Sequence, residues 1–485
     1  RYRFKRFSTD IDPVFNTSIF EGLKPVFEKY AGEYYSPFKI KKILENVDEI
    51  IDNNQLQFVQ HTVKESPGED GIDVRFKIFE GKKVQIERIN IIGNTVTNDS
   101  VIRSGLLIDE GDPYSKTRLE KSISNLKAMN IFNKVNYKIS DGSEPGLKAI
   151  DISIQEKPTG EITAGAGYGT EGGAFGFSIK ENNYLGKGLQ VSANADITSQ
   201  SIRGGINIVN PNYNYTGNKV YGGFYSKKTD KPSSGFENKL INLNIGTEFE
   251  QYRDIYLAPD LSFTIDDLTV DGTASSQLKK QAGTFEDITF GYAIKSDKRN
   301  RRFMPTDGHI VSFRQSLPVY ADTKSITNSF RYRTYHAFSE NLVGALKLYG
   351  AAVNGLGDED VRLSKRLHLG RTYLRGFESG KIGPKDGVDY VGGNYASALN
   401  IEAALPNLLP ESTETDISLF MDVANLWHVD YSTSLNDSDK LRSSVGIATN
   451  MYTPLGPLSF VVAHNLSKAD TDQTQSFNFQ IGTSF

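Results

Sequence analysis

Apolar and polar residues alternate along much of the chain after residue 157. Residues 189–198, LQVSANADIT, carry apolar residues at the odd positions and polar residues at the even ones. A period of two is that of a β-strand, because successive side chains point to opposite faces of a sheet. The alternation recurs in residues 398–405, 415–423 and 475–485, so we predict strands there as well. The apolar face of the first segment is formed by Leu189, Val191, Ala193, Ala195 and Ile197.

Two architectures accommodate strands of this kind. A soluble β-sandwich turns its polar face to water and packs its apolar face into a core, whereas a membrane barrel turns its apolar face to lipid and its polar face to the lumen. Residues 158–485 would supply about 16 strands at roughly 20 residues per strand and connection, which favours the barrel. Leu189, Val191 and Ile197 would then face lipid. The polar stretch 226–239 is predicted to be one long loop between strands.

The first 157 residues contain an internal repeat. GEYYSPFKIKKILENVDEI begins at Gly32 and GDPYSKTRLEKSISNLKAM begins at Gly111, while IDVRFKIFE begins at Ile72 and IDISIQEKP at Ile150. Each copy has the pattern β-α-α-β-β, and in the second copy Ser115 can cap a helix. We therefore predict two small α+β domains, residues 1–82 and 83–157, followed by the barrel domain, residues 158–485. The capped helix would bury Leu119, Ile123 and Leu126.

The composition supports many short strands. The chain has 44 glycines, 28 phenylalanines and 24 tyrosines, although only 38% of its residues are hydrophobic. No apolar run approaches the roughly 20 residues of a transmembrane helix. The net charge of −4, with both signs mixed along the chain, indicates no nucleic-acid surface. The absence of cysteine excludes disulfides and thiolate metal sites.

No catalytic or cofactor motif stands out. The six histidines lack the spacing of metal ligands, and no nucleophile elbow accompanies them. The glycines near residue 165 are expected in a strand with no following helix, so they do not form a phosphate loop. We therefore predict no enzyme activity, no metal and no cofactor. A barrel enzyme such as an outer-membrane lipase or protease would need a catalytic set that the sequence does not display.

Several short motifs, spread in order along the barrel region, carry a family resemblance. Together they make the chain similar to the BamA family, the central proteins of the bacterial outer-membrane barrel-assembly machine, and the repeated module resembles that family's POTRA domains. BamA proteins usually have five POTRA domains and only two occur here, and the first residue, Arg1, favours truncation of a longer protein. The motifs are GAGYGTEGG (165–173), NNYLGKG (182–188), FMPTDGHIV (303–311), LRGFESGKIGP (374–384), GGN (392–394), FMDVANLW (420–427) and PLGPL (454–458).

The resemblance implies a function and a location. The protein would lie in the outer membrane of a Gram-negative bacterium, with its POTRA domains in the periplasm, and would fold and insert other β-barrel proteins without ATP. Its partners would be unfolded barrel substrates, periplasmic accessory lipoproteins and outer-membrane lipid, and no nucleic acid. A transporter of the two-partner secretion type, from the same superfamily, is the alternative, although residues 1–20 show no plug helix before the first strand.

The resemblance also assigns a role to Arg375, Gly376 and Phe377. In this family the arginine-glycine-aromatic motif lies at the tip of a long loop after the eleventh strand, and that loop folds back into the lumen. An arginine there needs carboxylate partners. Glu402 and Asp422 fall on the polar phase of their predicted strands, which makes them the expected partners on the barrel wall.

The first and last barrel strands, near residues 160–170 and 476–485, must meet to close the barrel. The first is rich in glycine, which weakens strand packing. We therefore expect a weak seam with few backbone hydrogen bonds, able to open sideways, and a disulfide between Gly167 and Gln480 or a register neighbour would lock it. The seam residues are Gly160, Gly165, Gly167, Gly169, Phe477, Phe479, Ile481 and Phe485.

Overall fold

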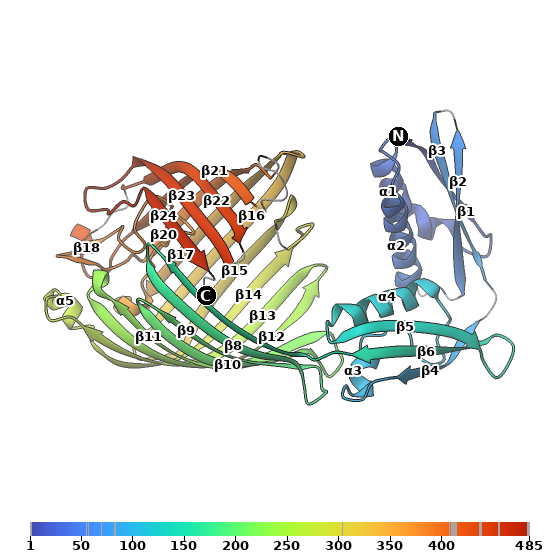
Figure 1. Cartoon of the computed structure of the whole chain (residues 1–485), viewed down its shortest axis with the longest axis horizontal. Coiled ribbons are helices and arrows are strands. Elements are labelled where there is room, and N and C mark those ends of the chain that lie inside the picture. Colours follow the sequence, from blue (N-terminus) through green and yellow to red (C-terminus); the bar gives the residue numbers. More distant parts are fainter. Residues whose placement is uncertain are drawn as a thin grey trace. The chain divides into compact units, whose positions relative to one another are not determined.

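The computed structural model separates the chain into two compact units (Figure 1). The first comprises Arg1–Thr159 with Leu185–Lys187, and the second comprises Gly160–Tyr184 with Gly188–Phe485. Within the described parts of the chain, no helix is long and apolar enough to cross a membrane. The structure describes residues 2–54, 56, 58–68, 70–81, 84–302, 304–406, 408, 415–435, 439–453 and 456–482.

The first module of unit 1 packs helices on a three-stranded sheet. Its strand order is β1-β3-β2, with β1 parallel and β2 antiparallel to the central strand. Alternate residues of β3 turn inward, so that Val74, Phe76 and Ile78 are buried while their neighbours Arg75 and Lys77 are exposed. The elements are β1 (Phe4–Ile11), η1 (Thr17–Gly22), α1 (Leu23–Tyr30), α2 (Pro37–Asn53), β2 (Val59–Gly68) and β3 (Gly71–Glu80).

The second module repeats this topology with strand order β4-β6-β5. Ser115 caps α4 as predicted, because its side-chain oxygen accepts a hydrogen bond from the Arg118 N–H. Leu119, Ile123 and Leu126 follow at helical spacing and are all buried against the sheet. The elements are β4 (Gln85–Ile92), α3 (Asp99–Arg103), α4 (Lys116–Ala128), β5 (Phe132–Asp141) and β6 (Leu147–Glu156).

Unit 2 is a closed, antiparallel barrel of 16 strands, as the sequence predicts. Each strand pairs with its neighbour in the chain, and the last strand pairs with the first. The strands are β7 (Gly160–Gly169), β8 (Gly172–Tyr184), β9 (Leu189–Thr198), β10 (Ser201–Tyr213), β11 (Asn218–Lys231), β12 (Phe236–Tyr252), β13 (Ile255–Val270), β14 (Gly283–Asp297), β15 (Asp307–Ala321), β16 (Ser325–Ser339), β17 (Leu342–Gly355), β20 (Tyr395–Ala404), β21 (Thr415–Trp427), β22 (Arg442–Thr453), β23 (Gly456–Ser467) and β24 (Phe477–Gly482).

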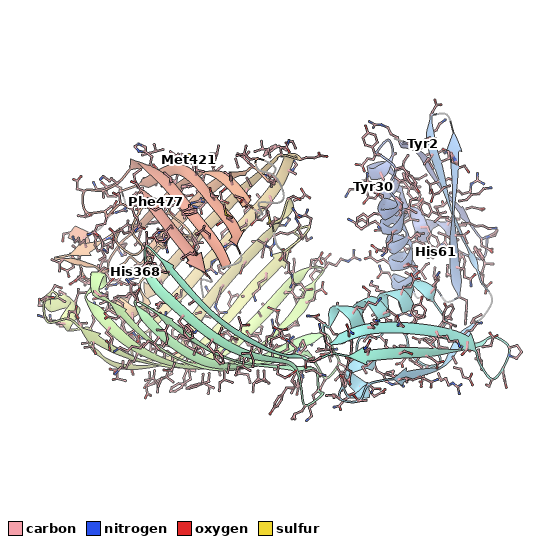
Figure 2. The ribbon with its side chains drawn as sticks, viewed as in Figure 1. Tyr2, Tyr30, His61, His368, Met421 and Phe477 are labelled. Carbon is pink, nitrogen blue, oxygen red and sulfur yellow. The ribbon has the colours of Figure 1, made fainter. Side chains whose placement is uncertain are left out.

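The apolar phase of the strands faces outward. Ile197 is 47% exposed, and its register partners Phe175 and Ile202 are exposed to a similar degree. Leu189 and Val191 share the phase of Ile197, as expected. Met421 and Phe477, both labelled in Figure 2, are exposed in the same way on their strands. A barrel with an apolar outer face matches the lipid-facing belt of a membrane barrel.

The prediction of one long loop over residues 226–239 is wrong. Ser226–Lys231 continue β11 and pair residue by residue with Phe236–Ile241 of β12, so only a single 3₁₀ turn, η2 (Pro232–Ser234), connects the strands. Gly235 ends that turn with a φ of 68°, a conformation that glycine adopts without steric cost. The segment reads as polar because backbone pairing does not require an apolar face.

A carboxylate fastens the turn after β4 in the second module. Glu156, the last residue of β6, accepts hydrogen bonds from the backbone N–H groups of Thr95, Val96 and Thr97 at 2.9, 2.9 and 2.6 Å. Burial opposes the charge of Glu156. The hydrogen bonds from Thr97, Thr95 and Val96 nevertheless outweigh this effect and lower its pKa to about 2. The turn is therefore held by a charged acceptor at neutral pH.

We predict that this contact stabilises the turn only while Glu156 is ionised. Because its pKa lies below the ordinary value of 4.5, the stabilisation is complete above pH 4.5 and disappears as the pH falls towards 2. Glu156→Gln should lower the opening free energy of the turn by about 1–2 kcal/mol at pH 7, after allowance for its partial exposure. Amide hydrogen exchange at residues 95–97 in the intact protein measures this.

The matched control is Glu144→Gln, which removes an exposed carboxylate from the same module. It should leave exchange at residues 95–97 unchanged. Equal exchange in the Glu156→Gln and wild-type proteins at pH 7 would contradict the assigned role.

Candidate functional site: a loop docked on the inner wall of the barrel

Residues 356–394, between β17 and β20, form a long segment that we call the lumen loop. It contacts Asp266 and Asp287 of β13 and β14 and also Asp422 of β21, strands that lie far apart in the closed order. These residues belong to the polar phase of their strands, opposite the exposed apolar phase. A segment that reaches the polar phase of such distant strands passes through the lumen. It contains η3 (Leu363–Lys365), β18 (Lys385–Asp386) and β19 (Asp389–Tyr390).

Arg375 forms a forked ion pair with Asp422. Its Nε and Nη2 donate to the two carboxylate oxygens of Asp422 at 2.7 and 2.6 Å, and its backbone N–H donates to the same carboxylate at 2.9 Å. Its Nη1 lies 2.9 Å from Glu402. The guanidinium also stacks on the Phe420 ring, 3.7 Å from the centroid. The planar fork and the flat ring fix both the position and the orientation of the arginine.

A single register row of the barrel wall receives the loop tip. Lys347, Asn400, Asp422, Ser444 and Asn465 lie directly opposite one another on five adjacent strands, β17 and β20–β23. All five point to the polar face, because a row of directly opposed residues shares one side of a sheet. The row therefore forms a continuous strip of hydrogen-bonding groups under the loop.

Each member of this row reaches the loop directly or through one carboxylate. Asn400 donates to the Tyr373 carbonyl at 2.9 Å and to Asp422 at 2.8 Å. Ser444 donates to the Arg375 carbonyl at 2.6 Å, and Asn465 donates to the Gly376 carbonyl at 2.8 Å. Lys347 pairs with Glu402 at 2.6 Å and so holds the second carboxylate of Arg375. The loop is thus bound through its backbone as well as its arginine.

Gly376 and Phe377 suit the tight space beyond Arg375. Gly376 has a φ of 85°, and a Cβ there would lie 3.0 Å from the Ala463 side chain. Glycine is therefore required by both conformation and space. Phe377 is only 2% exposed and packs in a cluster with Leu374 and Leu426. In this tripeptide, Arg375 pairs with carboxylates of the wall, Gly376 turns the backbone and Phe377 buries an apolar side chain.

The loop tip also pairs with the segment that leads into the last barrel strand. The Gln475 N–H donates to the Gly376 carbonyl, and the Glu378 N–H donates to the Gln473 carbonyl, at 2.9 and 3.0 Å. Phe377 and Thr474 form an antiparallel bridge between these bonds. Residue 475 lies two positions before β24. Backbone hydrogen bonds therefore link the loop tip to residues 473–475, the segment that leads into β24.

The sequence did not predict a second contact that holds the segment before β24, an ion pair between Arg442 and Asp472. Arg442, at the start of β22, is fully buried, and its Nε lies 2.9 Å from an oxygen of Asp472. The Asp472 carboxylate also accepts from the Ala469 N–H at 2.6 Å, and Arg442 donates to the Asn425 side chain at 2.7 Å. Both charges sit in polar stretches with no periodicity, so only the tertiary structure reveals the pair.

A third missed contact holds the beginning of the lumen loop. Arg362 is 3% exposed, and its Nη2 pairs with Asp287 at 2.5 Å while its Nε lies 3.4 Å from Asp266. Lys365 shares Asp287 at 2.9 Å. The guanidinium stacks on Phe285, 4.3 Å from the ring centroid. The lumen loop therefore uses a stacked, carboxylate-bound arginine at two separate points of the wall.

The structure brings only some of the predicted seam residues together. Gly167, Gly169 and Ile481 take part in the pairing between β7 and β24, whereas Gly160 and Gly165 lie opposite β8 residues and face no described residue of β24. The Phe479 carbonyl accepts from the Thr170 N–H, and Phe477 pairs with β23 alone. Phe485 lies outside the described residues. The register also contradicts the pair Gly167–Gln480, because Gln480 lies opposite Gly169.

The described residues contain no group of His, Asp and Glu side chains that could hold a metal ion. The site is therefore built from ion pairs, backbone hydrogen bonds and one close-packed turn.

Comparison with known proteins places most of the chain in a family. The model of the Omp85 superfamily domain matches residues 183–485, and the POTRA model, described as a surface antigen variable number repeat, matches residues 84–157. The chain belongs to the Omp85 superfamily. It is an outer-membrane protein with a periplasmic POTRA domain at residues 84–157, and the closed barrel with an apolar outer face agrees with this location.

Curated relatives of this Omp85 chain carry the name outer membrane protein assembly factor BamA. The protein from Neorickettsia risticii is 27% identical over 448 residues, covering 88% of this chain and 59% of the relative. The protein from Neisseria meningitidis is 23% identical over 520 residues, covering 96% of this chain and 64% of the relative. The chain thus spans less than two thirds of the length of either protein.

Solved structures show the same fold. The crystal structure of BamA from Haemophilus ducreyi lacking POTRA domains 1–3 aligns over the whole of both chains with a TM-score of 0.74 at 21% identity. CdiB from Escherichia coli aligns over the whole of this chain and 90% of its own, with a TM-score of 0.58 at 12% identity.

We predict that Arg375 fixes the position of the loop tip more than it stabilises the barrel. Removing one partner of a fully buried pair costs about 3–5 kcal/mol, and less where lumen water reaches the remaining carboxylates. In Arg375→Ala, amide exchange at Glu378 and Gln475 should rise at least tenfold while heat-modifiable migration of the barrel persists. Arg375→Lys should give an intermediate rate, because an ammonium cannot form the planar fork.

Arg371→Ala is the matched control from the same loop. Its guanidinium lies 3.8 Å from Glu171 in a partly exposed pair, so its loss should leave both amides protected. Wild-type exchange in both Arg375 variants would show that the fork does not hold the loop.

Proposed function

We propose that this protein folds β-barrel proteins and inserts them into the outer membrane, without ATP and without a covalent step. The observation that carries the proposal is the seam. The first and last strands pair at only three positions among the described residues, compared with ten between β7 and β8 and five between β23 and β24. The names of the curated relatives point to the same activity.

The proposed mechanism is strand exchange at this seam. Opening the seam would expose unpaired N–H and C=O groups on β7 and β24, and inside lipid such groups must find hydrogen-bonding partners. An incoming strand supplies them by β-augmentation. Glycine keeps the pairing weak, since Gly167 and Gly169 contribute no side chain to the wall at the seam. The energy would come from the new backbone bonds and from lipid burial of the substrate.

The lumen loop would set the geometry of this exchange. Its tip is fixed on the wall by Arg375, and it hydrogen-bonds to residues 473–475 immediately before β24. We propose that this contact keeps β24 aligned for pairing, first with β7 and then with the substrate. The three motif residues and their partners Glu402 and Asp422 would thus be positioning residues of the seam.

The partners of this activity would be unfolded barrel proteins, outer-membrane lipid and periplasmic accessory lipoproteins. In the sheets of the two N-terminal modules, β2 and β5 are edge strands with no outer strand partner among the described residues. Such edges accept an extended segment by β-augmentation. We propose that residues 1–82 form a second POTRA domain beside the matched one and that both bind substrate strands or lipoproteins through these edges.

A disulfide across the seam tests the proposal. Tyr168 and Ile481 lie directly opposite each other, and opposed residues of an antiparallel pair meet the distance range of a disulfide. Gly169→Cys is less suitable, because a Cβ there would lie 2.5 Å from the Phe479 carbonyl oxygen. In liposomes, the oxidised Tyr168→Cys/Ile481→Cys protein should insert an unfolded barrel substrate at least tenfold more slowly, and a reductant should restore the rate.

The matched control is Ala166→Cys/Phe175→Cys, which joins the opposed residues of β7 and β8 without crossing the seam. It should insert substrate at the wild-type rate in both redox states. The natural chain has no cysteine, so each disulfide is the only one formed. Full activity of the locked seam would sink the mechanism, and release of an enclosed passenger without substrate insertion would favour export, the activity of the two-partner secretion alternative.

A further inference from the structure

A basic pocket of about 840 Å³ lies in the barrel, apart from the docking site of the loop tip. It occupies the end of the barrel at which β7 begins, next to the turn 253–254 and the connection 298–306. Six cations and three carboxylates line it, an excess of three positive charges. The cations are Lys295, Arg299, Arg301, Arg302, Arg331 and Arg333, and the carboxylates are Glu248, Asp254 and Asp297.

The side chains of the pocket face the lumen. Lys295, Ser312 and Arg331 lie directly opposite one another on β14, β15 and β16 and therefore share one side of the sheet. Ile294 and Phe330, their neighbours in the chain, are 43% and 40% exposed on the lipid side. The charged row must then point inward. The pocket is open to solvent within the barrel and separated from the acyl chains by the wall.

The three carboxylates neutralise only part of the positive charge of the pocket. Asp297 is occupied by the fork of Arg299, at 2.8 and 2.6 Å. Glu248 is shared between Lys295 and Lys219, both at 2.8 Å, and Lys219 does not line the pocket. Asp254 lies 3.8 Å from Lys298. The carboxylates are therefore paired with Arg299 and Lys295 of the pocket and with lysines beside it.

Three guanidinium groups of the pocket take part in no ion pair among the described residues. Among the residues that the structure describes, Arg302, Arg331 and Arg333 have no carboxylate within ion-pair distance. Arg302 interacts with Asp297 at longer range, and Arg331 stacks loosely on Tyr349, 5.7 Å from the centroid. An arginine fork matches a carboxylate or a phosphate. Three of them around one hollow form a site for an anionic ligand.

The pocket adjoins the wall strip that holds the loop tip. Arg333 lies opposite Lys347, the residue that pairs with Glu402 beneath Arg375. Arg331 lies opposite Tyr349, whose ring stacks on Tyr373 of the lumen loop at 4.1 Å. A ligand in the pocket would therefore lie within one register step of residues that position the loop.

We propose that this pocket binds the acidic side chains of an extended polypeptide that enters the lumen from the periplasm. The inward orientation excludes a lipid held by its acyl chains in the bilayer. The excess of forked cations suits anionic groups, and carboxylates are the anionic groups that a polypeptide carries. The size of the pocket suits several residues rather than a single small ion. That the polypeptide is an unfolded barrel substrate rests on the proposed function, but the anion site itself does not.

The test is direct binding to the intact protein in a nonionic detergent. The probe is a fluorescein-labelled peptide of alternating Glu and Ser, and its matched partner has Gln in place of each Glu. The acidic peptide should bind, its affinity should fall steeply with added salt, and the Gln peptide should bind at least tenfold more weakly. Arg302→Gln/Arg333→Gln should weaken binding of the acidic peptide about tenfold or more.

These two arginines suit the test because their side chains form no ion pair with any described residue. The matched control is Arg203→Gln, which removes an arginine of β10 that stacks on Tyr225 away from the pocket. It should leave the affinity unchanged. Equal affinity of the double variant and the wild type would overturn the proposal. So would displacement of the peptide by inorganic phosphate at concentrations below those at which free glutamate peptide competes, since the site would then prefer phosphates.

The binding experiment is independent of assembly. Loss of substrate insertion with intact peptide binding would contradict the proposed function and leave the acidic-peptide site standing. Absence of peptide binding in a protein that still inserts substrate would overturn the site alone.

Discussion

The structure around the lumen depends on one constraint, the need of Arg375 for carboxylates inside a wide barrel. A barrel of this size has a water-accessible interior that side chains of the wall alone do not fill. The lumen loop is ordered there because a forked arginine meets Asp422 and Glu402 at fixed positions on two adjacent strands. The pair adds little net stability, because desolvation offsets much of the attraction. We expect its effect to be positional, because the directional fork favours one place for the loop among the many that a long segment could adopt.

That position has consequences along the chain. With Arg375 fixed, Gly376 and Glu378 meet residues 473–475, and these lead directly into β24. Arg442 and Asp472 hold the same connection from the other side through a second buried pair. The segment that leads into β24 is thus held at two points, by the loop tip and by Arg442. The strand β24 itself pairs with β7 at only three described positions. In the proposed mechanism, this anchored connection would keep the edge of β24 aligned while its hydrogen bonds pass from one strand partner to another.

The lumen is not electrostatically uniform. The strip of Lys347, Asn400, Asp422, Ser444 and Asn465 is largely satisfied by the loop, with each side chain engaged in a hydrogen bond or ion pair. Arg331 and Arg333 of the adjoining strand β16 line the basic pocket and form no ion pair among the described residues. One part of the wall therefore holds the protein's own loop, and the neighbouring part carries the basic pocket for which we propose a polypeptide ligand. Both parts follow from the rule that directly opposed residues share a face.

The sequence determined the architecture because its evidence is local and repeated. Alternation predicted the strands and their lipid face, the duplicated motif predicted two like modules, and Ser115 with Leu119 predicted a capped helix. The alternation within their own strands also predicted that Glu402 and Asp422 lie on the polar face of the sheet. Polarity alone misled at residues 226–239, because a strand remains paired wherever its backbone finds a partner.

Only the tertiary structure decided what depends on register and on contacts between distant segments. It placed Gln480 opposite Gly169, joined Arg442 to Asp472, and gathered arginines from β16 and from the connection 298–306 into one pocket. A one-residue change of register would reverse the facing of every side chain in a strand, and no local pattern fixes the stagger between the first and last strands of a barrel. The physical reason is that an ion pair between distant residues does not change the pattern of apolar and polar positions around either partner, so that pattern cannot reveal the pair.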